Sequence, residues 1–583
     1  MKKGDITTVK IERTRYPGKG IGPIQDGGTA IPCAVKGAVP GQILKVRISK
    51  KRKGKAEGKL LDVLALAPDA VTPVCPMFGR CGGCTYQSTA YPSQLAMKDG
   101  WVMALLAEAG ITGFEHLPAL PSPEIYGYRN KMEFSFGDDC PGGPLMLGLH
   151  EKGHFYNIVS AQDCALAHPD FGAIVTAVLD YFRSRGAQAF HKRAHTGFLR
   201  YLVVRRGAAT GEIMVNLVTT SQGTLDDAAF VQALDHLPLV GSLITVIHSV
   251  YDGVADVARA DTSRMLLGEG IIHDTILGID FAVSPFSFLQ TNTRGAETLY
   301  TAVRRAVTAG TERRGSGKKP AVFDLYCGVG TIAQVLAPIA EHVTGIELVP
   351  EAVAAARANA AANGLTNCTF IVGDVKAEVG KLAEAPEVIV LDPPREGIHP
   401  RALPDILAFA PACFVYVSCK ASSLARDLPA FVAAGYRVET VQCVDMFPQT
   451  VHVETVVLLS HKTPESHIHV KVEFGEGKDK VPLEKIAERA EKYKPKERVT
   501  YKKIKEYIAE KYGFKVHTAY IAEVKRAFGL PMYDAPNAVE ELKNPRKHPT
   551  KEKVKAIADA LVHFGLIDKK DISTLKIAHL SAS

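Results

Sequence analysis

Apolar and polar residues alternate in short runs over the first 65 residues of the chain. The runs ITTVKIERT, TAIPCAV, QILKVRIS and GKLLDVLAL are separated by glycine and proline, a pattern typical of short strands joined by tight turns. We therefore expect a small OB-like β-barrel over residues 1–66. The basic run KKRKGKAEGK lies between two of these strands, where its charge suits contact with a phosphate backbone.

A second group of apolar runs extends from about residue 126 to residue 280. EFSFG, RYLVVRR, IMVNLVTT and LITVIHSVY are typical of strands, and one helical stretch near residues 170–186 interrupts them. The pattern predicts a central α+β domain over residues 67–280.

From residue 321 onward the chain changes to strands and helices in alternation. The continuous apolar runs AVFDL, HVTGIEL, CTFIVGD, EVIVLDPP and CFVYVSC are separated by helical segments such as PEAVAAARANAAANG. Such strands are typical of a parallel, doubly wound sheet that helices cover on both faces. We expect a Rossmann-like domain over residues 281–462, and hence a multidomain α/β protein.

Beyond about residue 464 the chain is rich in lysine and helical in pattern. Two short helices are predicted around YKKIKEYIAEKYG and TAYIAEVKRAFG, either as a helix-turn-helix-like pair or as a basic tail. Residues 465–583 thus form a basic extension whose role the pattern does not define.

Charge is distributed unevenly over the 583 residues, although the net charge is only +8. Residues 1–60 contain 15 Lys and Arg against 4 Asp and Glu, and residues 462–583 contain 26 against 18. Two basic ends indicate a polyanionic partner, most simply nucleic acid, with solvated surface charge as the alternative. No membrane-spanning run and no signal peptide are recognisable, so we expect a cytoplasmic protein that does not contact a membrane.

Three of the eleven cysteines are clustered. Cys75, Cys81 and Cys84 form a C-x5-C-x2-C spacing in the glycine-rich stretch CPMFGRCGGC, and Cys164 follows in SAQDCALAH. Thiolates at this spacing suit a [4Fe-4S] cluster whose fourth ligand comes from elsewhere, and Cys164 is the candidate. Structural zinc is the competing interpretation, although zinc sites more often use two CxxC halves.

The segment AVFDLYCGVGTIA predicts a strand, a glycine turn and a helix. Glu347, Asp374 and Asp392 stand at the ends of the following three strands. Three such acids, without GxGxxG or a Walker lysine, suit an adenosyl group that carries no phosphate, and hence S-adenosyl-L-methionine. Helix capping by the same acids is the competing interpretation.

Cys419 ends the strand FVYVS, at the sheet edge where doubly wound folds bind ligands. A thiolate beside a methyl donor suits methylation of uracil at C5. Addition of the thiolate at C6 makes C5 nucleophilic, and a base must then remove the C5 proton. Glu454, in MFPQTVHVETVVLL, is the candidate base. The target nucleotide must leave its stack to reach a buried thiol.

These motifs, in this order, resemble those of the RNA uracil-C5 methyltransferase family. The matching stretches are FSFLQTNT (286–293), DLYCGVGT (324–331), DPPR (392–395), VSC (417–419) and PQTVHVE (448–454). The resemblance covers about residues 1–461. It implies that the barrel is a TRAM domain and that the cysteines bind a [4Fe-4S] cluster.

The resemblance also implies a role for individual residues. Cys419 would be the nucleophile and Glu454 the proton-abstracting base, while Phe288 would stack near the target base. The residues implied to contact S-adenosyl-L-methionine are Gln290, Tyr326, Glu347, Asp374 and Asp392.

Two features depart from the family pattern. Lys420-Ala421 follow the nucleophile where many members have Asn-Pro, and an added lysine is expected to lower the pKa of the thiol. The extension after residue 465 has no counterpart in the resemblance.

With both a barrel and a cysteine cluster, the chain resembles the 23S ribosomal RNA enzymes, so we expect 23S rRNA as the substrate. We also expect a monomeric enzyme. A tRNA substrate is the alternative. An inert iron–sulfur RNA-binding protein would have no chemical need for both Cys419 and Glu454. Cytosine-C5 methylation would need a proton donor to N3, for which we find no motif.

Overall fold

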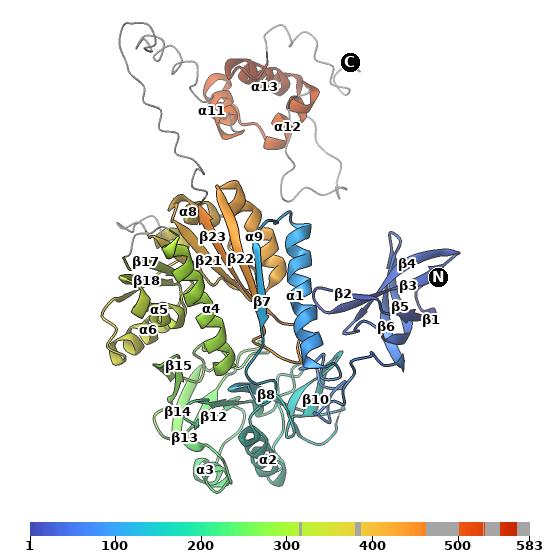
Figure 1. Cartoon of the computed structure of the whole chain (residues 1–583), viewed down its shortest axis with the longest axis vertical. Coiled ribbons are helices and arrows are strands. Elements are labelled where there is room, and N and C mark those ends of the chain that lie inside the picture. The colour runs from blue at the N-terminus through green and yellow to red at the C-terminus, as the bar shows by residue number, and fades with distance from the viewer. Residues whose placement is uncertain are drawn as a thin grey trace. The chain divides into compact units, whose positions relative to one another are not determined.

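The computed structural model describes residues 1–140, 142–313, 318–378, 386–461, 501–528, 530 and 549–567. The chain divides into two compact units, residues 1–465 and 466–583. Within its described residues the first unit contains sheets of six, seven and eight strands and one two-stranded hairpin (Figure 1).

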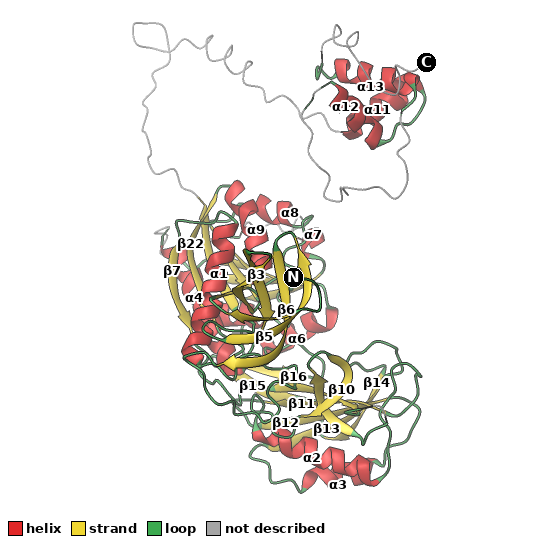
Figure 2. Cartoon of the chain, turned by 90° about the vertical axis from the view of Figure 1, so that its right-hand side faces the viewer, coloured by secondary structure: helices red, strands yellow, loops and turns green. Residues whose placement is uncertain are grey.

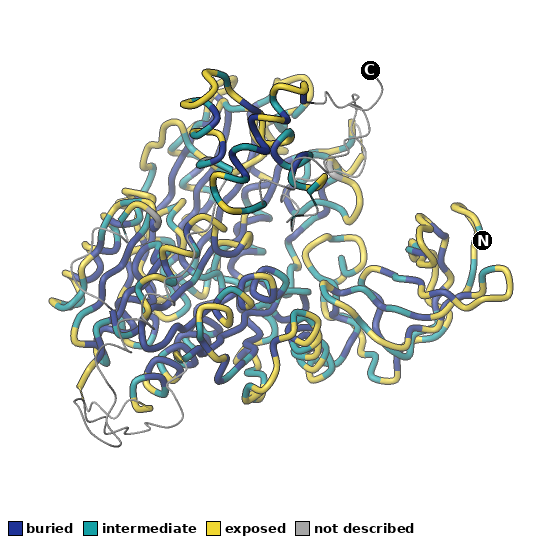
Figure 3. The backbone as a smooth tube through the Cα atoms, turned by 90° about the horizontal axis from the view of Figure 1, so that it is seen from above, coloured by how far each residue is buried: buried dark blue, intermediate teal, exposed yellow. Residues whose placement is uncertain are grey.

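The N-terminal sheet has the strand order β1-β5-β6-β4-β3-β2. Alternation along β5 buries Leu44, Val46 and Ile48 in a small apolar core and leaves the residues between them exposed. Many residues of this N-terminal sheet are consequently exposed (Figure 3). The strands are β1 (Ile6–Lys10), β2 (Arg13–Arg15), β3 (Lys19–Asp26), β4 (Thr29–Lys36), β5 (Ile43–Arg52) and β6 (Lys55–Ala65).

The central sheet has the order β10-β9-β8-β11-β12-β13-β14. Helices α2 (Pro169–Ser184) and α3 (Asp227–Asp235) cover one of its faces (Figure 2), and Phe171, Phe182 and Phe230 fill the space between. The strands are β8 (Lys131–Gly137), β9 (Met146–Glu151), β10 (His154–Ser160), β11 (Leu199–Arg206), β12 (Glu212–Thr219), β13 (Ser242–Val250) and β14 (Thr262–Leu267). The hairpin of β15 (Ile272–Ile276) and β16 (Ile279–Val283) follows.

The eight-stranded sheet has the order β19-β18-β17-β20-β21-β23-β22-β7. The strands from β19 to β21 run parallel, and β23 is antiparallel to both of its neighbours. The start of β23 therefore lies at the same edge as the ends of the parallel strands. The strands are β7 (Glu115–Leu120), β17 (Ala321–Leu325), β18 (His342–Glu347), β19 (Cys368–Val372), β20 (Val388–Leu391), β21 (Cys413–Ser418), β22 (Tyr436–Val444) and β23 (Glu454–His461).

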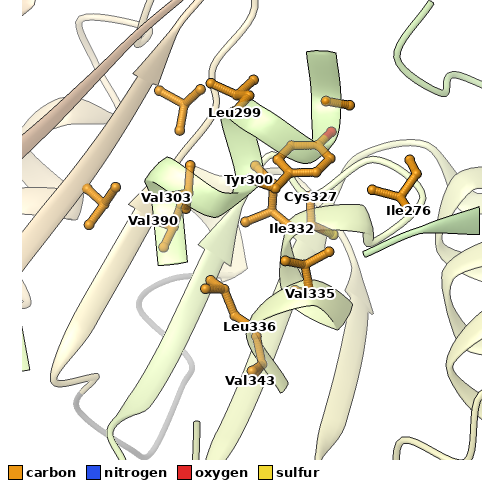
Figure 4. Packing of buried hydrophobic residues seen from close by; sticks show 14 of the residues in the cluster. Ile276, Leu299, Tyr300, Val303, Cys327, Ile332, Val335, Leu336, Val343 and Val390 are labelled. Atoms are coloured by element: carbon orange, nitrogen blue, oxygen red, sulfur yellow. The ribbon is translucent and has the colours of Figure 1, made fainter. Parts of the chain in front are cut away.

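Both faces of this sheet are buried, as its continuous apolar strands predict. Val322 of β17 faces one apolar cluster and its neighbour Phe323 faces the other. Figure 4 shows the first cluster, in which side chains of α4 and α5 lie near Val390 and Val343 of the sheet. The helices are α1 (Tyr91–Glu108), α4 (Thr293–Glu312), α5 (Thr331–Leu336), α6 (Pro350–Ala362), α7 (Val375–Glu378), α8 (Leu403–Ala408) and α9 (Ala421–Ala433), with a 3-10 turn at Ala337–Ile339.

Two elements within residues 67–280, the range predicted as the central domain, form part of the domain built on the eight-stranded sheet. One is a strand of that sheet and the other is a helix packed against it. Strand β7 pairs in parallel with β22, and α1 buries Val102 and Leu106 in the core that also holds α9. Residues 284–292, which include most of the motif FSFLQTNT, contain neither strand nor helix.

The second unit contains three described helices with an apolar core of their own. They are α11 (Tyr501–Tyr512), α12 (Thr518–Ala527) and α13 (Lys551–His563). Ile508, Ile521 and Ile557 are fully buried among them. The first two helices agree with the sequence pattern, and the third was not predicted. None of the described helices is both long and apolar enough to cross a membrane.

Candidate active site and cysteine-lined cavity

The predicted reactive residues stand at the tips of neighbouring strands. Tyr326, Asp392 and Cys419 directly follow β17, β20 and β21, Glu347 ends β18, and Glu454 begins β23. Because β23 runs antiparallel, all five meet at one edge of the sheet. They line a single cavity of about 1360 Å³.

The glycine turn after β17 forms one end of this cavity. Gly330 has φ +74°, and a Cβ there would come within 2.6 Å of the Phe370 ring, so the close approach of turn and strand requires glycine. The backbone N–H of Gly328 donates to Glu347 Oε2 at 3.1 Å. Glu347 thus braces the turn as well as lining the cavity.

Gln290 and Asp374, the remaining predicted cofactor residues, line the same cavity, as does Phe288. The Phe288 side chain is 66% exposed, which leaves its ring accessible to a planar ligand. Asp374 stands directly before α7. The structure therefore brings every predicted nucleophile, base and cofactor residue to one cavity.

Cys419 and Glu454 form the reactive end of the cavity. Ser418 and Thr455 are paired across β21 and β23, so the cysteine and the glutamate are the next residues beyond that pair. Burial, Glu454 and Asp392 raise the pKa of the Cys419 thiol to about 12. Burial and Asp392 raise the pKa of Glu454 to about 8.

Asp392 makes this end of the cavity more acidic. Burial raises its pKa to about 7. Three acidic groups in one desolvated region oppose one another's ionisation, since each charge raises the cost of the next. A bound cation would lower the pKa of all three.

Sequence analysis missed three cavity residues that carry or influence charge. Arg395, Arg129 and His452 also line the cavity. Arg395 is the cation that lowers the pKa of both Cys419 and Glu454, whereas the sequence directed attention to Lys420. The position of Arg395 in DPPR and of His452 in PQTVHVE was a signal available from the motifs themselves.

The four predicted cluster cysteines line a second, smaller cavity of about 320 Å³. The backbone N–H of Gly83 donates to Cys81 Sγ at 3.3 Å, and Gln87 Nε2 donates to Cys84 Sγ at 3.1 Å. Such donors stabilise thiolates. Without a metal, burial and the neighbouring thiols raise the pKa of Cys84 to about 12.

Among the residues that the structure describes, no three His, Cys, Asp or Glu side chains are arranged to hold one metal ion. The structure therefore brings Cys75, Cys81, Cys84 and Cys164 to one cavity without showing a metal site.

Arg129 and Thr291 line both cavities, so the cysteine-lined cavity lies directly behind the wall of the larger one. The Arg129 guanidinium lies 5.6 Å from the centre of the Phe447 ring, near enough for a cation–π contact.

Two family models match the chain. One described as tRNA (Uracil-5-)-methyltransferase matches residues 253–462, and one described as TRAM domain matches residues 1–61. An uncharacterized RNA methyltransferase of Caldanaerobacter subterraneus is 43% identical over 459 residues, 79% of this chain and 99% of the relative. One of Clostridium tetani is 42% identical over 462 residues, with the same coverage of both chains.

A solved structure shares the architecture. It is the Pyrococcus abyssi tRNA (uracil-54, C5)-methyltransferase in complex with S-adenosyl-L-homocysteine, with 26% identity and a TM-score of 0.61. The similarity covers 77% of this chain and 99% of that chain.

Proposed function

Because the chain belongs to the RNA uracil-C5 methyltransferase family and carries a TRAM domain, we propose that it transfers the methyl group of S-adenosyl-L-methionine to C5 of a uridine in RNA. The observation that carries this proposal is the position of Cys419 and Glu454, on adjacent strand tips in one cavity.

The proposed reaction begins with the Cys419 thiolate, which adds to C6 of the uracil and leaves an enolate across C4 and C5. Carbon C5 then attacks the sulfonium methyl group, a C–C bond forms, the C–S bond breaks, and S-adenosyl-L-homocysteine remains. The Glu454 carboxylate removes the C5 proton. The electron pair restores the C5–C6 double bond and expels the thiolate.

The surroundings of the two groups suit these roles. With a pKa of about 8, Glu454 is basic enough to accept a proton from carbon near neutral pH. The Cys419 thiol begins as a weak acid because burial and its acidic neighbours raise its pKa. A positive sulfonium in the same cavity, together with Arg395, would favour the thiolate. This arrangement would form the nucleophile only when the methyl donor is bound.

The larger cavity has room for the nucleoside part of the methyl donor and for the target uracil flipped out of its RNA. Glu347, beside the glycine turn, is placed to accept ribose hydroxyls. Gln290, Tyr326, Asp374 and Asp392 would complete the contacts with the methyl donor. The solved Pyrococcus abyssi relative, which binds S-adenosyl-L-homocysteine, supports this assignment.

A [4Fe-4S] cluster on Cys75, Cys81, Cys84 and Cys164 is part of the proposal. What supports a cluster is that four cysteines line one cavity and that amide donors are directed at two of the sulfur atoms. Protein purified without oxygen should be brown. Colourless protein with stoichiometric zinc would exclude the cluster.

We assign 23S rRNA as the substrate, because the TRAM domain and the cysteine cluster together resemble the ribosomal RNA enzymes. The Pyrococcus abyssi relative favours tRNA as the second candidate, since a tRNA enzyme is matched over nearly its whole length.

One experiment separates these substrates. The protein is incubated with labelled S-adenosyl-L-methionine and, separately, with unmodified 23S rRNA and unmodified tRNA. The product nucleotide is then mapped by mass spectrometry. 5-Methyluridine in 23S rRNA alone is expected. Methylated tRNA alone would overturn the substrate assignment, and absence of 5-methyluridine from both would overturn the function.

A further inference from the structure

The loop that precedes Glu454 contains a residue in an unusual conformation. Gln449 has φ +67° and is 1% exposed. A non-glycine residue in this left-handed region is strained and persists only where its surroundings hold it. Gln449 lies five residues before Glu454, the first residue of β23, so the contacts that hold it restrain the segment that leads to the carboxylate.

Helix α1 supplies the first of these contacts. The backbone N–H of Gln449 donates to Gln94 Oε1 at 3.0 Å, and Gln94 Nε2 donates to Gln449 Oε1 at 2.9 Å. Gln94 is itself 1% exposed. The Gln94 side chain thus binds both the backbone and the side chain of Gln449, 355 positions away in the sequence, and loss of either bond would leave buried polar groups without these partners.

The segment that follows the cluster cysteines supplies the second contact. The backbone N–H groups of Thr85 and Tyr86 both donate to the Gln449 carbonyl oxygen, at 2.8 and 3.1 Å. Thr85 directly follows Cys84. Gln94 Nε2 also donates to the carbonyl of Tyr86, at 3.0 Å. The cysteine loop, helix α1 and the loop before Glu454 are therefore connected at one residue.

The TRAM domain reaches the same loop. Gly18 packs so closely against it that a Cβ there would come within 2.6 Å of Val451 Cγ1 and 2.5 Å of the Tyr86 hydroxyl. The TRAM domain, which would contact RNA, and the cysteine loop, which would hold the cluster, therefore both contact the segment that leads to Glu454.

We propose that Gln449 and Gln94 are positioning residues for Glu454, and that they link the cysteine loop to removal of the C5 proton. The inference rests on the proposed function. Neither Gln94 nor Gln449 lines the larger cavity, although the loop they hold contributes His452 to it. We therefore expect removal of the C5 proton, which needs the Glu454 carboxylate at C5, to be slowed more than thiolate addition and methyl transfer.

The test uses two variants of the full-length, cluster-containing protein. Gln94→Leu preserves volume and removes both side-chain hydrogen bonds to Gln449. Gln449→Gly removes the side-chain acceptor, while glycine adopts the left-handed backbone freely, so this variant is expected to fold. Gln162→Leu, which loses side-chain hydrogen bonds with Ser160 and Thr176 in the central domain, is the matched control.

A misplaced carboxylate slows proton removal, by up to about a hundredfold for a displacement near 1 Å. Each of the two variants should therefore accumulate a covalent RNA–protein adduct that already carries the methyl group. The Kd for S-adenosyl-L-methionine should change less than about twofold. Because the residues act as one unit, the double variant should be no slower than the slower single variant.

Hydrogen–deuterium exchange provides a readout apart from turnover. Backbone amides of residues 449–454 should exchange faster in Gln94→Leu and in Cys84→Ser protein that lacks the cluster, but not in Gln162→Leu. If wild-type protein forms no 5-methyluridine, the proposed function fails. If wild-type protein methylates RNA and both variants turn over without adduct, or lose cofactor binding in parallel with turnover, the positioning role is wrong.

Discussion

Cys419 and Glu454 are the next residues beyond the paired Ser418 and Thr455, at the edge where antiparallel β23 meets parallel β21. The reversal of β23 causes this proximity, since a parallel strand would have carried the glutamate to the opposite edge. The proposed nucleophile and the proposed base thus come from segments 35 positions apart in the sequence.

Replacement of Cys419 by alanine should abolish methyl transfer, because no covalent adduct forms and C5 stays unreactive. Labelled methyl incorporation into RNA measures this, and a loss of at least about 10³-fold is expected. Cys443→Ala, which removes a buried thiol from β22, should stay active. Full turnover by Cys419→Ala would eliminate the cysteine as nucleophile.

The charge of the bound cofactor should control the reactivity of Cys419. Burial, together with the acidic neighbours Glu454 and Asp392, raises the pKa of this thiol to about 12, and a sulfonium would lower it. At about pH 7.5, addition of S-adenosyl-L-methionine should raise the rate at which iodoacetamide alkylates Cys419, as measured by mass spectrometry. The neutral product S-adenosyl-L-homocysteine controls for steric effects and should not raise the rate. Equal rates with both ligands would argue against electrostatic activation.

Glu454 should make the free protein less stable as the pH rises. Its pKa is raised from 4.5 to about 8, so the folded state binds a proton that the unfolded state releases, and stability falls between about pH 4.5 and pH 8. Glu454→Gln removes this pH-dependent loss, so its free energy of unfolding relative to wild type should rise by about 3–4 kcal/mol from pH 5 to pH 8.

Urea unfolding at these two pH values measures the difference. Glu396→Gln, an exposed position, should keep the wild-type pH dependence. Parallel curves for wild type and Glu454→Gln would contradict the raised pKa.

The sequence predicted the strands whose tips carry the site, because continuous apolar runs and the acids and cysteine after them are local features. Contacts between distant segments were not predictable in this way. The amides of Gln94 and Gln449 pair across 355 residues, and Lys98 forms a fully buried ion pair with Asp445 at 2.7 Å. Hydrophobic periodicity carries no information on such partners.

The same limit explains the misassigned elements. Strand β7 has a proline and a mixed burial pattern, so its sequence does not identify the edge to which it adds. Arg395 was overlooked because its effect depends on the desolvated acids around it, which only the fold assembles.

Removal of residues 466–583 should weaken RNA binding without affecting the chemistry. This unit has its own apolar core, and the tRNA (Uracil-5-)-methyltransferase family model ends at residue 462. With 26 Lys and Arg against 18 Asp and Glu over residues 462–583, the extension should neutralise additional RNA phosphates. The slope of log K against log salt should therefore become shallower by about 1 for each phosphate that the truncated protein leaves unneutralised. An unchanged slope would mean that the extension binds another partner.

In the proposed reaction Cys419 forms a covalent bond to the pyrimidine, and Glu454 removes the C5 proton so that this bond breaks. The most direct test is to incubate Glu454→Gln protein with S-adenosyl-L-methionine and the RNA substrate, and to identify the products by mass spectrometry. A stable adduct between Cys419 and a methylated uridine is predicted, with little free 5-methyluridine. Normal release of 5-methyluridine without an adduct would contradict the account.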